Sequence, residues 1–208
     1  MNKTLVAWAL ALGVAMPAAA ATGVFGSYLA IDTDGAGATA PTWYGAQQPG
    51  SQWLSAFGGA NLGSFALGST ATLAGAELLT WKNGGGDITG ATLNWRVDGG
   101  SYQSIAIGWT ANSTFTDVAG NTFTNWGDQK WAGLSTSSTN FLAGLSAGTH
   151  TLQVYFTGLS NEGNRDSGSA ANPFSASFAV TSPVPEPASP MLLFAGLALL
   201  AVLKRRRA

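Results

Sequence analysis

The side chains that could act as general acids or bases are few in this sequence. Apart from the two ends of the chain there are one histidine, His150, two glutamates, Glu77 and Glu162, and seven aspartates. His150 alternates in phase with Leu152 and Val154, which predicts a packing residue at the start of a strand rather than a catalytic base. No Gly-x-Ser-x-Gly elbow stands in a strand-to-helix context. Nothing in the sequence brings Glu77 and Glu162 together as the carboxylate pair of a glycosidase, so we expect no enzyme.

Two acidic loops carry oxygen ligands of the kind that calcium prefers. Asp32 and Asp34 stand two residues apart before Gly35, and residues 161–166 are rich in Asn, Glu, Asp and Gly. Neither loop completes an EF-hand, because the bidentate glutamate that should follow Asp32 is missing. The same residue types also form ordinary turns. Calcium at Asp32 and Asp34 is therefore one interpretation and a plain turn the other, and no other cofactor is predicted.

Tryptophan is the other conspicuous residue type. Trp95 and Trp109 fall on the apolar side of an alternating pattern, which predicts that both lie in the core. Trp126 and Trp131 belong instead to a polar stretch, residues 125–131, where flat rings beside hydrogen-bonding groups could stack on sugar rings. The sequence thus makes Trp126 and Trp131 a candidate carbohydrate site, with burial in the core as the competing interpretation.

The C-terminal end has three parts in a fixed order. Residues 184–187 are proline-rich and so are not helical throughout, residues 191–203 are apolar or glycine without a polar face, and residues 204–207 are all basic. At about 1.5 Å per residue the apolar run spans roughly 20 Å, less than the roughly 30 Å hydrocarbon core. Two preceding small residues can extend the helix, and the basic side chains can snorkel. We predict a transmembrane helix at residues 189–203 with a basic stop, and a buried helix is the alternative.

Together these three parts resemble the PEP-CTERM sorting signal of Gram-negative bacteria that make exopolysaccharide. The resemblance is carried by the motif Pro185, Glu186 and Pro187, by the apolar run 191–203, and by the membrane stop Lys204, Arg205, Arg206 and Arg207. It implies that an exosortase-like enzyme reads and removes the tail, after a transient stay in the inner membrane. It also implies delivery to the cell surface or the extracellular matrix. The resemblance covers only the end of the chain.

The N-terminus has the pattern of a secretory signal peptide. Lys3 supplies one positive charge, residues 5–16 are mostly apolar, and small residues allow cleavage after Ala20 or Ala21. A transmembrane anchor is the alternative, but the apolar run is short and lacks a polar stop. The predicted division is a signal peptide at 1–21, an ectodomain at 22–182 and a sorting signal at 183–208.

The composition limits what the ectodomain can be. The chain has 208 residues and no cysteine, which excludes disulfides, thiolate metal sites and a cysteine nucleophile. Charged residues make up 9%, against roughly 25% in average soluble proteins, so hydroxyl and amide side chains must keep the surface soluble. Without Lys3, Glu186 and the basic residues 204–207, four positive and nine negative side chains remain, a net charge near −5. That balance argues against a nucleic-acid partner.

Hydrophobic residues in the ectodomain recur with a period of two. The clearest hairpin alternates over residues 92–97 and 105–109 around the tight turn Asp98-Gly99-Gly100. Other strands are predicted at 24–31, 149–156 and 174–180, with weaker ones near 77–81 and 114–124, whereas a loop is expected around Pro41 and residues 51–72 are not assigned. Short half-buried strands without a long amphipathic helix predict an all-β fold, a single β-sandwich of immunoglobulin-like or jelly-roll type.

The sequence therefore favours an exported cell-surface or matrix protein with a non-enzymatic structural or adhesive role in exopolysaccharide or biofilm. Its expected partners are the exosortase-like enzyme, the inner membrane and exopolysaccharide. A carbohydrate-binding module is the first alternative, and a secreted hydrolase is the second.

Overall fold

The computed structural model describes residues 21–35, 39–135, 139–183 and 205. Within these residues the chain forms thirteen β-strands. They are β1 (Ala21–Asp32), β2 (Thr42–Gln47), β3 (Asn61–Ala66), β4 (Thr72–Asn83), β5 (Ile88–Val97), β6 (Gln103–Asn112), β7 (Phe115–Thr116), β8 (Thr122–Phe123), β9 (Asp128–Leu134), β10 (Thr139–Asn140), β11 (Gly148–Ser160), β12 (Arg165–Ser167) and β13 (Phe174–Thr181). The described ranges contain no helix with the length and apolar character needed to cross a membrane. The predicted helix at 189–203 and the predicted signal peptide, apart from Ala21, lie outside these ranges.

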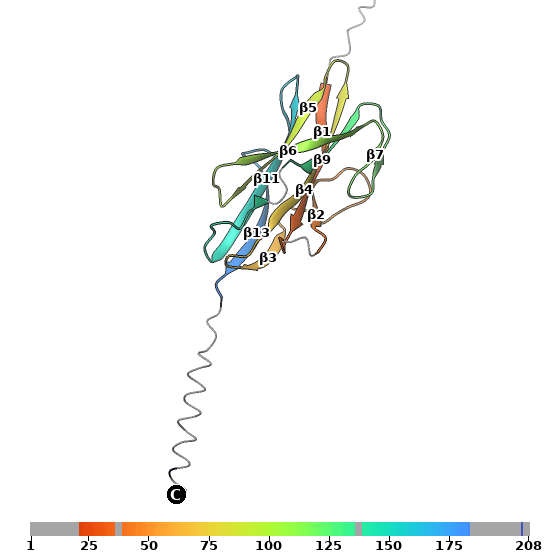
Figure 1. The fold of residues 1–208 in the computed structure, drawn as a ribbon. Helices are drawn as coiled ribbons and strands as arrows, with labels where there is room; N and C mark the ends of the chain where they lie inside the picture. The colour runs from red at the N-terminus through yellow and green to blue at the C-terminus, as the bar shows by residue number, and fades with distance from the viewer. Residues whose placement is uncertain (1–20, 36–38, 136–138, 184–204, 206–208) are drawn as a thin grey trace, which may run out of the picture.

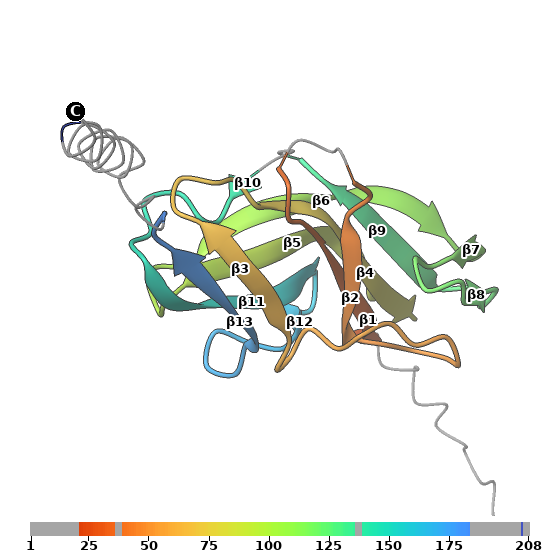
Figure 2. The ribbon, with the colours of Figure 1, turned by 90° about the horizontal axis from the view of Figure 1, so that it is seen from below.

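Eleven of the strands belong to one curled sheet (Figures 1 and 2). Nine follow the order β2-β1-β4-β9-β6-β5-β11-β13-β3, while β10 pairs with β4 and β12 pairs with β11. All pairs in this sheet are antiparallel except β13 with β3. The chain after β2 links the two edges, because Gly45 bridges Ala56 and the backbone N–H of Gly59 donates to Ser175 O of β13 at 2.7 Å.

The all-β prediction is confirmed for the described residues, whereas the sandwich is not. A sandwich has two separate sheets, but here the hydrogen-bonded path runs without a break from β2 to β3. The strands predicted at 24–31, 149–156 and 174–180 correspond to β1, β11 and β13. The sequence pattern did not predict β2, which follows the expected loop at Pro41. It also did not predict β9, which lies in the polar stretch that we interpreted as a loop.

The predicted hairpin is confirmed as β5 and β6. Leu93 faces Ile105 and Trp95 faces Gln103 across the pair. Asp98 and Gly99 both have positive φ, 51° and 71°, as a tight two-residue turn requires. The turn closes with Gly100 N–H donating to Val97 O at 3.0 Å.

The core has two parts, one on each face of the sheet. The larger part fills the inside of the curl, which we call the inner face, and includes Leu78, Leu93 and Phe156, each 0% exposed. The smaller part lies on the outer face, where Tyr28 and Leu79 pack under Phe115 of the separate β7–β8 hairpin. β1 and β4 are therefore buried on both faces, which explains their almost uninterrupted burial.

A polar network fastens the β7–β8 hairpin to the sheet. The Tyr28 hydroxyl donates to Asp117 Oδ2 at 2.6 Å, and the Val118 N–H donates to Glu77 Oε1 at 3.2 Å. Glu77 is fully buried and pairs with Lys130 Nζ of β9 at 2.8 Å. Burial raises the pKa of the Glu77 carboxyl, and the Lys130 ammonium acts in the opposite direction.

Tyr28→Phe should lower the free energy of unfolding by about 1.5–3 kcal/mol, because it leaves the buried Asp117 carboxylate without the hydroxyl donor. Urea unfolding at neutral pH measures this loss. Tyr44→Phe is the matched control, since Tyr44 is only partly buried and its hydroxyl makes no hydrogen bond with the described residues. Equal stabilities for the two variants would contradict the role of the Tyr28–Asp117 bond.

Candidate functional site

The structure separates the two tryptophans that the sequence put into one carbohydrate site. Trp131 lies in β9 on the inner face, is 6% exposed, and its Nε1–H donates to Thr80 Oγ1 at 3.2 Å. It cannot offer a ring face to a sugar, so for Trp131 the core interpretation is correct. Trp126 lies in the turn before β9 and is 82% exposed. Only Trp126 of this pair is therefore available for stacking.

Trp126 borders a hollow of about 300 Å³ formed with the β4–β5 turn. Its other lining residues are polar or glycine: Lys82, Asn83, Gly84, Gly85, Gly86, Asp87 and Asn112. Gly127 allows the Trp126 turn to lie against β4, because any side chain at Gly127 would collide with the Lys82 carbonyl. The Lys82 N–H also donates to Gly127 O at 3.0 Å, which holds the ring beside the hollow.

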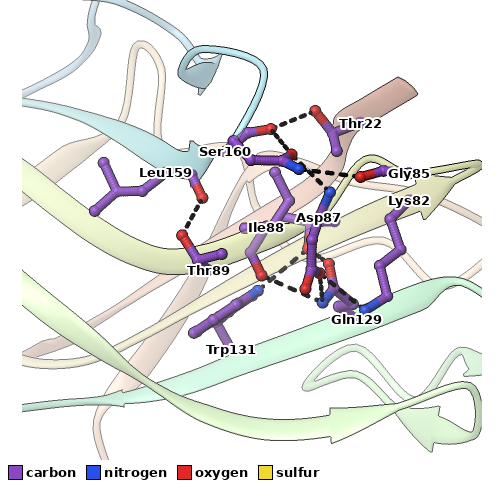
Figure 3. A network of polar contacts seen from close by, with 12 residues as sticks. Thr22, Lys82, Gly85, Asp87, Ile88, Thr89, Gln129, Trp131, Leu159 and Ser160 are labelled. Carbon is purple, nitrogen blue, oxygen red and sulfur yellow. Dashed lines mark hydrogen bonds and ion pairs between the residues drawn. The ribbon is translucent and has the colours of Figure 1, made fainter. Parts of the chain in front are cut away.

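The charges at this hollow cancel each other. Lys82 Nζ donates to Asp87 Oδ1 at 2.8 Å, and Gln129 Nε2 donates to the same oxygen at 3.1 Å (Figure 3). The hydrogen bond from Lys82 holds the pKa of the Asp87 carboxyl below its usual value. A paired cation and anion beside an exposed indole suit an uncharged ligand with hydroxyl groups better than a polyanion or polycation.

The β4–β5 turn is held in place by residues 161–166, the second loop that the sequence suggested for calcium. Asn161 Nδ2 donates to Gly85 O at 3.0 Å, and Asn161 Oδ1 accepts the Asp87 N–H at 2.9 Å. Ser160 shares a hydrogen bond with Thr22 of β1 at 2.9 Å (Figure 3). Asn161 therefore positions the wall of the hollow.

A second exposed indole, Trp109, lies near the same end of the sheet. Trp109 faces Trp131 in register, and their rings meet edge to face at 5.0 Å, yet Trp109 is 53% exposed. The prediction that Trp109 is a core residue is wrong, although it does share the face of Ile107. β5 and β6 stop pairing after Ile107, so among the described residues no strand pairs with β6 beside Trp109 on that side. The β6–β9 pair has register shifts on both sides of Trp109, and the alternation of apolar and polar residues in the sequence does not reveal them.

His150 has polar partners that the sequence did not reveal. Its Nδ1 lies 2.6 Å from Asp98 Oδ2, and its Nε2 lies 2.9 Å from the backbone oxygen of Ser146. Both partners only accept hydrogen bonds, so the arrangement favours a doubly protonated ring. The hydrogen bond to Asp98, assisted by that to Ser146, raises the pKa of His150. The ring is 8% exposed and stacks on Phe178, so His150 packs at the start of β11 as predicted.

The order Asp98, His150, Ser146 resembles a hydrolase triad, and residues 144–148 have Gly-x-Ser-x-Gly spacing. The contact at Nε2, however, is to the carbonyl of Ser146 and not to its hydroxyl. A general base needs a free nitrogen lone pair directed at the nucleophile. In this arrangement both ring nitrogens are occupied, and His150 acts as a brace between the β5–β6 turn and the segment before β11.

The remaining candidate acids lie apart. Glu77 is buried against Lys130, whereas Glu162 lies in the β11–β12 turn beside Arg165, with 3.7 Å between the charged atoms. The structure does not bring the two glutamates together as a catalytic pair.

The Asp32 loop forms a hydrogen-bonded turn. Asp32 Oδ1 accepts the N–H groups of Asp34 and Gly35, each at 3.0 Å, and Asp34 Oδ2 accepts both the N–H and the hydroxyl of Thr39 at 2.8 Å. In the part of the chain that the structure describes, no three His, Cys, Asp or Glu side chains gather as a metal site would need. Calcium at Asp32 and Asp34 stays a prediction.

Residues 183–207 match the family model of the PEP-CTERM protein-sorting motif. The chain carries this sorting motif. The resemblance of the tail is thereby confirmed, although the Pro185–Pro187 motif and the stop residues Lys204, Arg206 and Arg207 lie outside the described residues. No curated protein matches the chain. The last strand, β13, ends at Thr181, so the PEP-CTERM motif follows almost directly on the sheet.

The His150 brace should make the stability of the domain depend on pH. Its pKa is higher in the folded state than the ordinary value near 6.5. The stabilisation is therefore fully present below about pH 6.5 and is lost as the pH rises through the folded-state pKa. Urea midpoints of the wild type and of His150→Gln, measured from acid to alkaline pH, should converge as the pH rises. A constant difference across that range would contradict the brace.

Proposed function

We propose that this is an exported protein whose β domain has a non-enzymatic structural or adhesive role in an exopolysaccharide matrix or biofilm. The observation that carries the proposal is the PEP-CTERM motif at residues 183–207, which implies export, membrane-associated sorting and processing by an exosortase-type enzyme. The tail would hold the protein in the inner membrane only until it is processed. The mature domain would then reach the cell surface or the matrix.

The composition, the sheet edges and the buried titratable groups of the domain support this role. Charged residues are rare, and the two edges of the sheet are linked through residues 56–59, which limits edge-to-edge association. Of the groups considered for acid–base chemistry, His150 has both ring nitrogens engaged and Glu77 is buried against Lys130. These features suit a durable polar surface that binds without turnover.

Carbohydrate binding is the second candidate, and the Trp126 hollow favours it. An 82% exposed indole beside amide groups and a neutralised ion pair is suited to stacking on an uncharged sugar ring. Ala21 of β1 pairs with Asn83 at this end, whereas Val180 near the end of β13 pairs with Gly148 at the other. β1 begins and β13 ends at opposite ends of the domain (Figure 1). The hollow would therefore lie at the end of the domain opposite the end of β13, and we expect it to remain accessible to polymer during sorting.

Trp126→Ala should weaken retention of the protein by its exopolysaccharide by about 2–10-fold, because it removes the stacking surface. Affinity electrophoresis in gels containing the purified polymer measures retention. Trp53→Ala is the matched control, since Trp53 is 68% exposed but lies in the β2–β3 connection and does not line the hollow. Unchanged retention in Trp126→Ala, alone and combined with Trp109→Ala, would exclude this site.

Tail processing predicts a mass difference between cells with and without the exosortase. The mature protein from exosortase-containing cells should lack residues 204–208, and the protein from deficient cells should keep them. Intact-mass spectrometry of both forms decides the point. If both forms keep residues 204–208, the tail is a plain anchor.

A further inference from the structure

A second hollow, of about 200 Å³, lies on the outer face, where the β7–β8 hairpin packs against the sheet. Separate elements supply its lining: Phe25 of β1, Trp81 of β4, Phe123 of β8, Asn125 of the loop after β8 and Asp128 of β9. The volume is below the roughly 300–1,000 Å³ of sites for drug-sized molecules, so the hollow suits one compact chemical group. We call it the outer hollow.

The walls of the outer hollow are aromatic. Its three rings, those of Phe25, Trp81 and Phe123, are each only partly buried, so each keeps some of its surface open. Phe25 and Phe123 have their ring centres 5.3 Å apart and their planes inclined at 58°. Inclined rings enclose a rounded group, whereas a flat sugar ring needs a flat platform.

Gly23 allows the third ring to take its place. It lies opposite Trp81 in the β1–β4 pair, and a side chain at Gly23 would collide with the Trp81 indole. The indole therefore lies against the backbone of β1, beside Phe25. The position of this wall is set by the sheet before any ligand binds, which reduces the ordering cost of binding.

Asp128 adds a negative charge to the outer hollow. It faces Trp81 in register, so both side chains lie on the outer face. Asp128 is 8% exposed, and burial raises the pKa of its carboxyl, while a hydrogen bond with Asn125 acts in the opposite direction. Among the described residues, Asp128 is not one whose side-chain polar atoms are both sealed from solvent and without a hydrogen bond. A carboxylate oxygen that Asn125 does not bind is therefore open to the hollow.

No cation of the described residues neutralises Asp128. It takes part in none of the ion pairs of that part of the chain. Lys130 lies two residues further along β9 and on the same face, but its Nζ lies 2.8 Å from Glu77 Oε2 and donates to Thr116 O at 2.7 Å. The lining itself includes no lysine, arginine or histidine. Buried carboxylates are normally paired, so the outer hollow is complementary to a positive charge.

We propose that the outer hollow binds an organic cation, with a methylated ammonium group enclosed by the three rings and its charge facing Asp128. Aromatic rings attract a cation that lies within about 6 Å of the ring centre, most strongly when the cation is desolvated. A primary ammonium has three N–H donors to satisfy, whereas a trimethylammonium group has none and suits a lining with few acceptors. The outer hollow and the Trp126 hollow share no residue, so this inference does not rest on the proposed function.

The test uses choline chloride and the ¹⁵N-labelled exported protein at constant ionic strength. The readout is the indole N–H resonance of Trp81, assigned by its disappearance in Trp81→Phe. Choline should shift it in a saturable way and leave the Trp131 resonance unchanged. The matched control ligand is the carbon analogue of choline, in which a tert-butyl group replaces the trimethylammonium group. It should bind at least about 10-fold more weakly, because it has the shape without the charge. No shift with choline, or equal affinity for the two ligands, would overturn the proposal.

Asp128→Asn should weaken choline binding by about 5–20-fold, because it removes the charge and keeps the shape. Asp166→Asn is the matched control variant, since it removes the same charge from an exposed residue that does not line the outer hollow. Equal weakening in both variants would show that only the net charge of the domain attracts choline, and it would overturn the proposal.

Phe25→Leu tests the aromatic wall independently of the charge. It should weaken choline binding by about 3–10-fold through the loss of one ring, and urea midpoints verify that each variant is folded. Unchanged affinity in folded Phe25→Leu would contradict the aromatic enclosure. Phosphatidylcholine vesicles form a second arm: co-sedimentation that Asp128→Asn abolishes identifies a lipid headgroup as the source of the cation, and choline binding without co-sedimentation identifies a soluble one.

Discussion

The buried Glu77–Lys130 pair is the contact on which the rest of the domain depends. A carboxylate that is fully buried is tolerated only when it is paired and hydrogen-bonded, and Lys130 of β9 and Val118 of the β7–β8 hairpin fulfil both conditions. The pair fixes β9 beside β4. With β9 in place, Trp131 is directed into the core and Trp126 is held beside the β4–β5 turn.

The same contact explains why the sequence did not reveal β9 but did reveal the other long strands. β1, β11 and β13 alternate apolar and small or polar residues, so their period of two is visible. β9 instead begins Asp-Gln-Lys, and all three residues are at least partly buried. Gln129 and Lys130 are paired with Asp87 and Glu77, which are distant in the sequence. Polarity signals a loop only when the polar groups face water, and no local pattern shows that Glu77 lies opposite Ala132, beside Lys130.

A candidate site could be predicted from the sequence only where its residues are close together along the chain. The PEP-CTERM motif is contiguous and was recognised from the residues alone. Trp126 was singled out for its polar surroundings and is exposed, whereas the exposure of Trp109 depends on where β5 stops pairing with β6. The partner of His150 lies 52 residues away at Asp98, and only the β5–β11 register brings the two together.

Each lysine and arginine side chain of the described ectodomain has a partner within the same molecule. Lys82 binds Asp87, Lys130 binds Glu77, Arg96 binds Gln153 and covers Tyr102, and Arg165 donates to Thr22 O and pairs with Glu162. The surface therefore presents hydroxyl, amide and indole groups in place of unpaired positive charge. A polymer bound by such a surface would be held by stacking and neutral hydrogen bonds, which salt screens far less than ion pairs. The low charge content that first set this sequence apart is thus the physical basis of the proposed affinity for neutral polysaccharide.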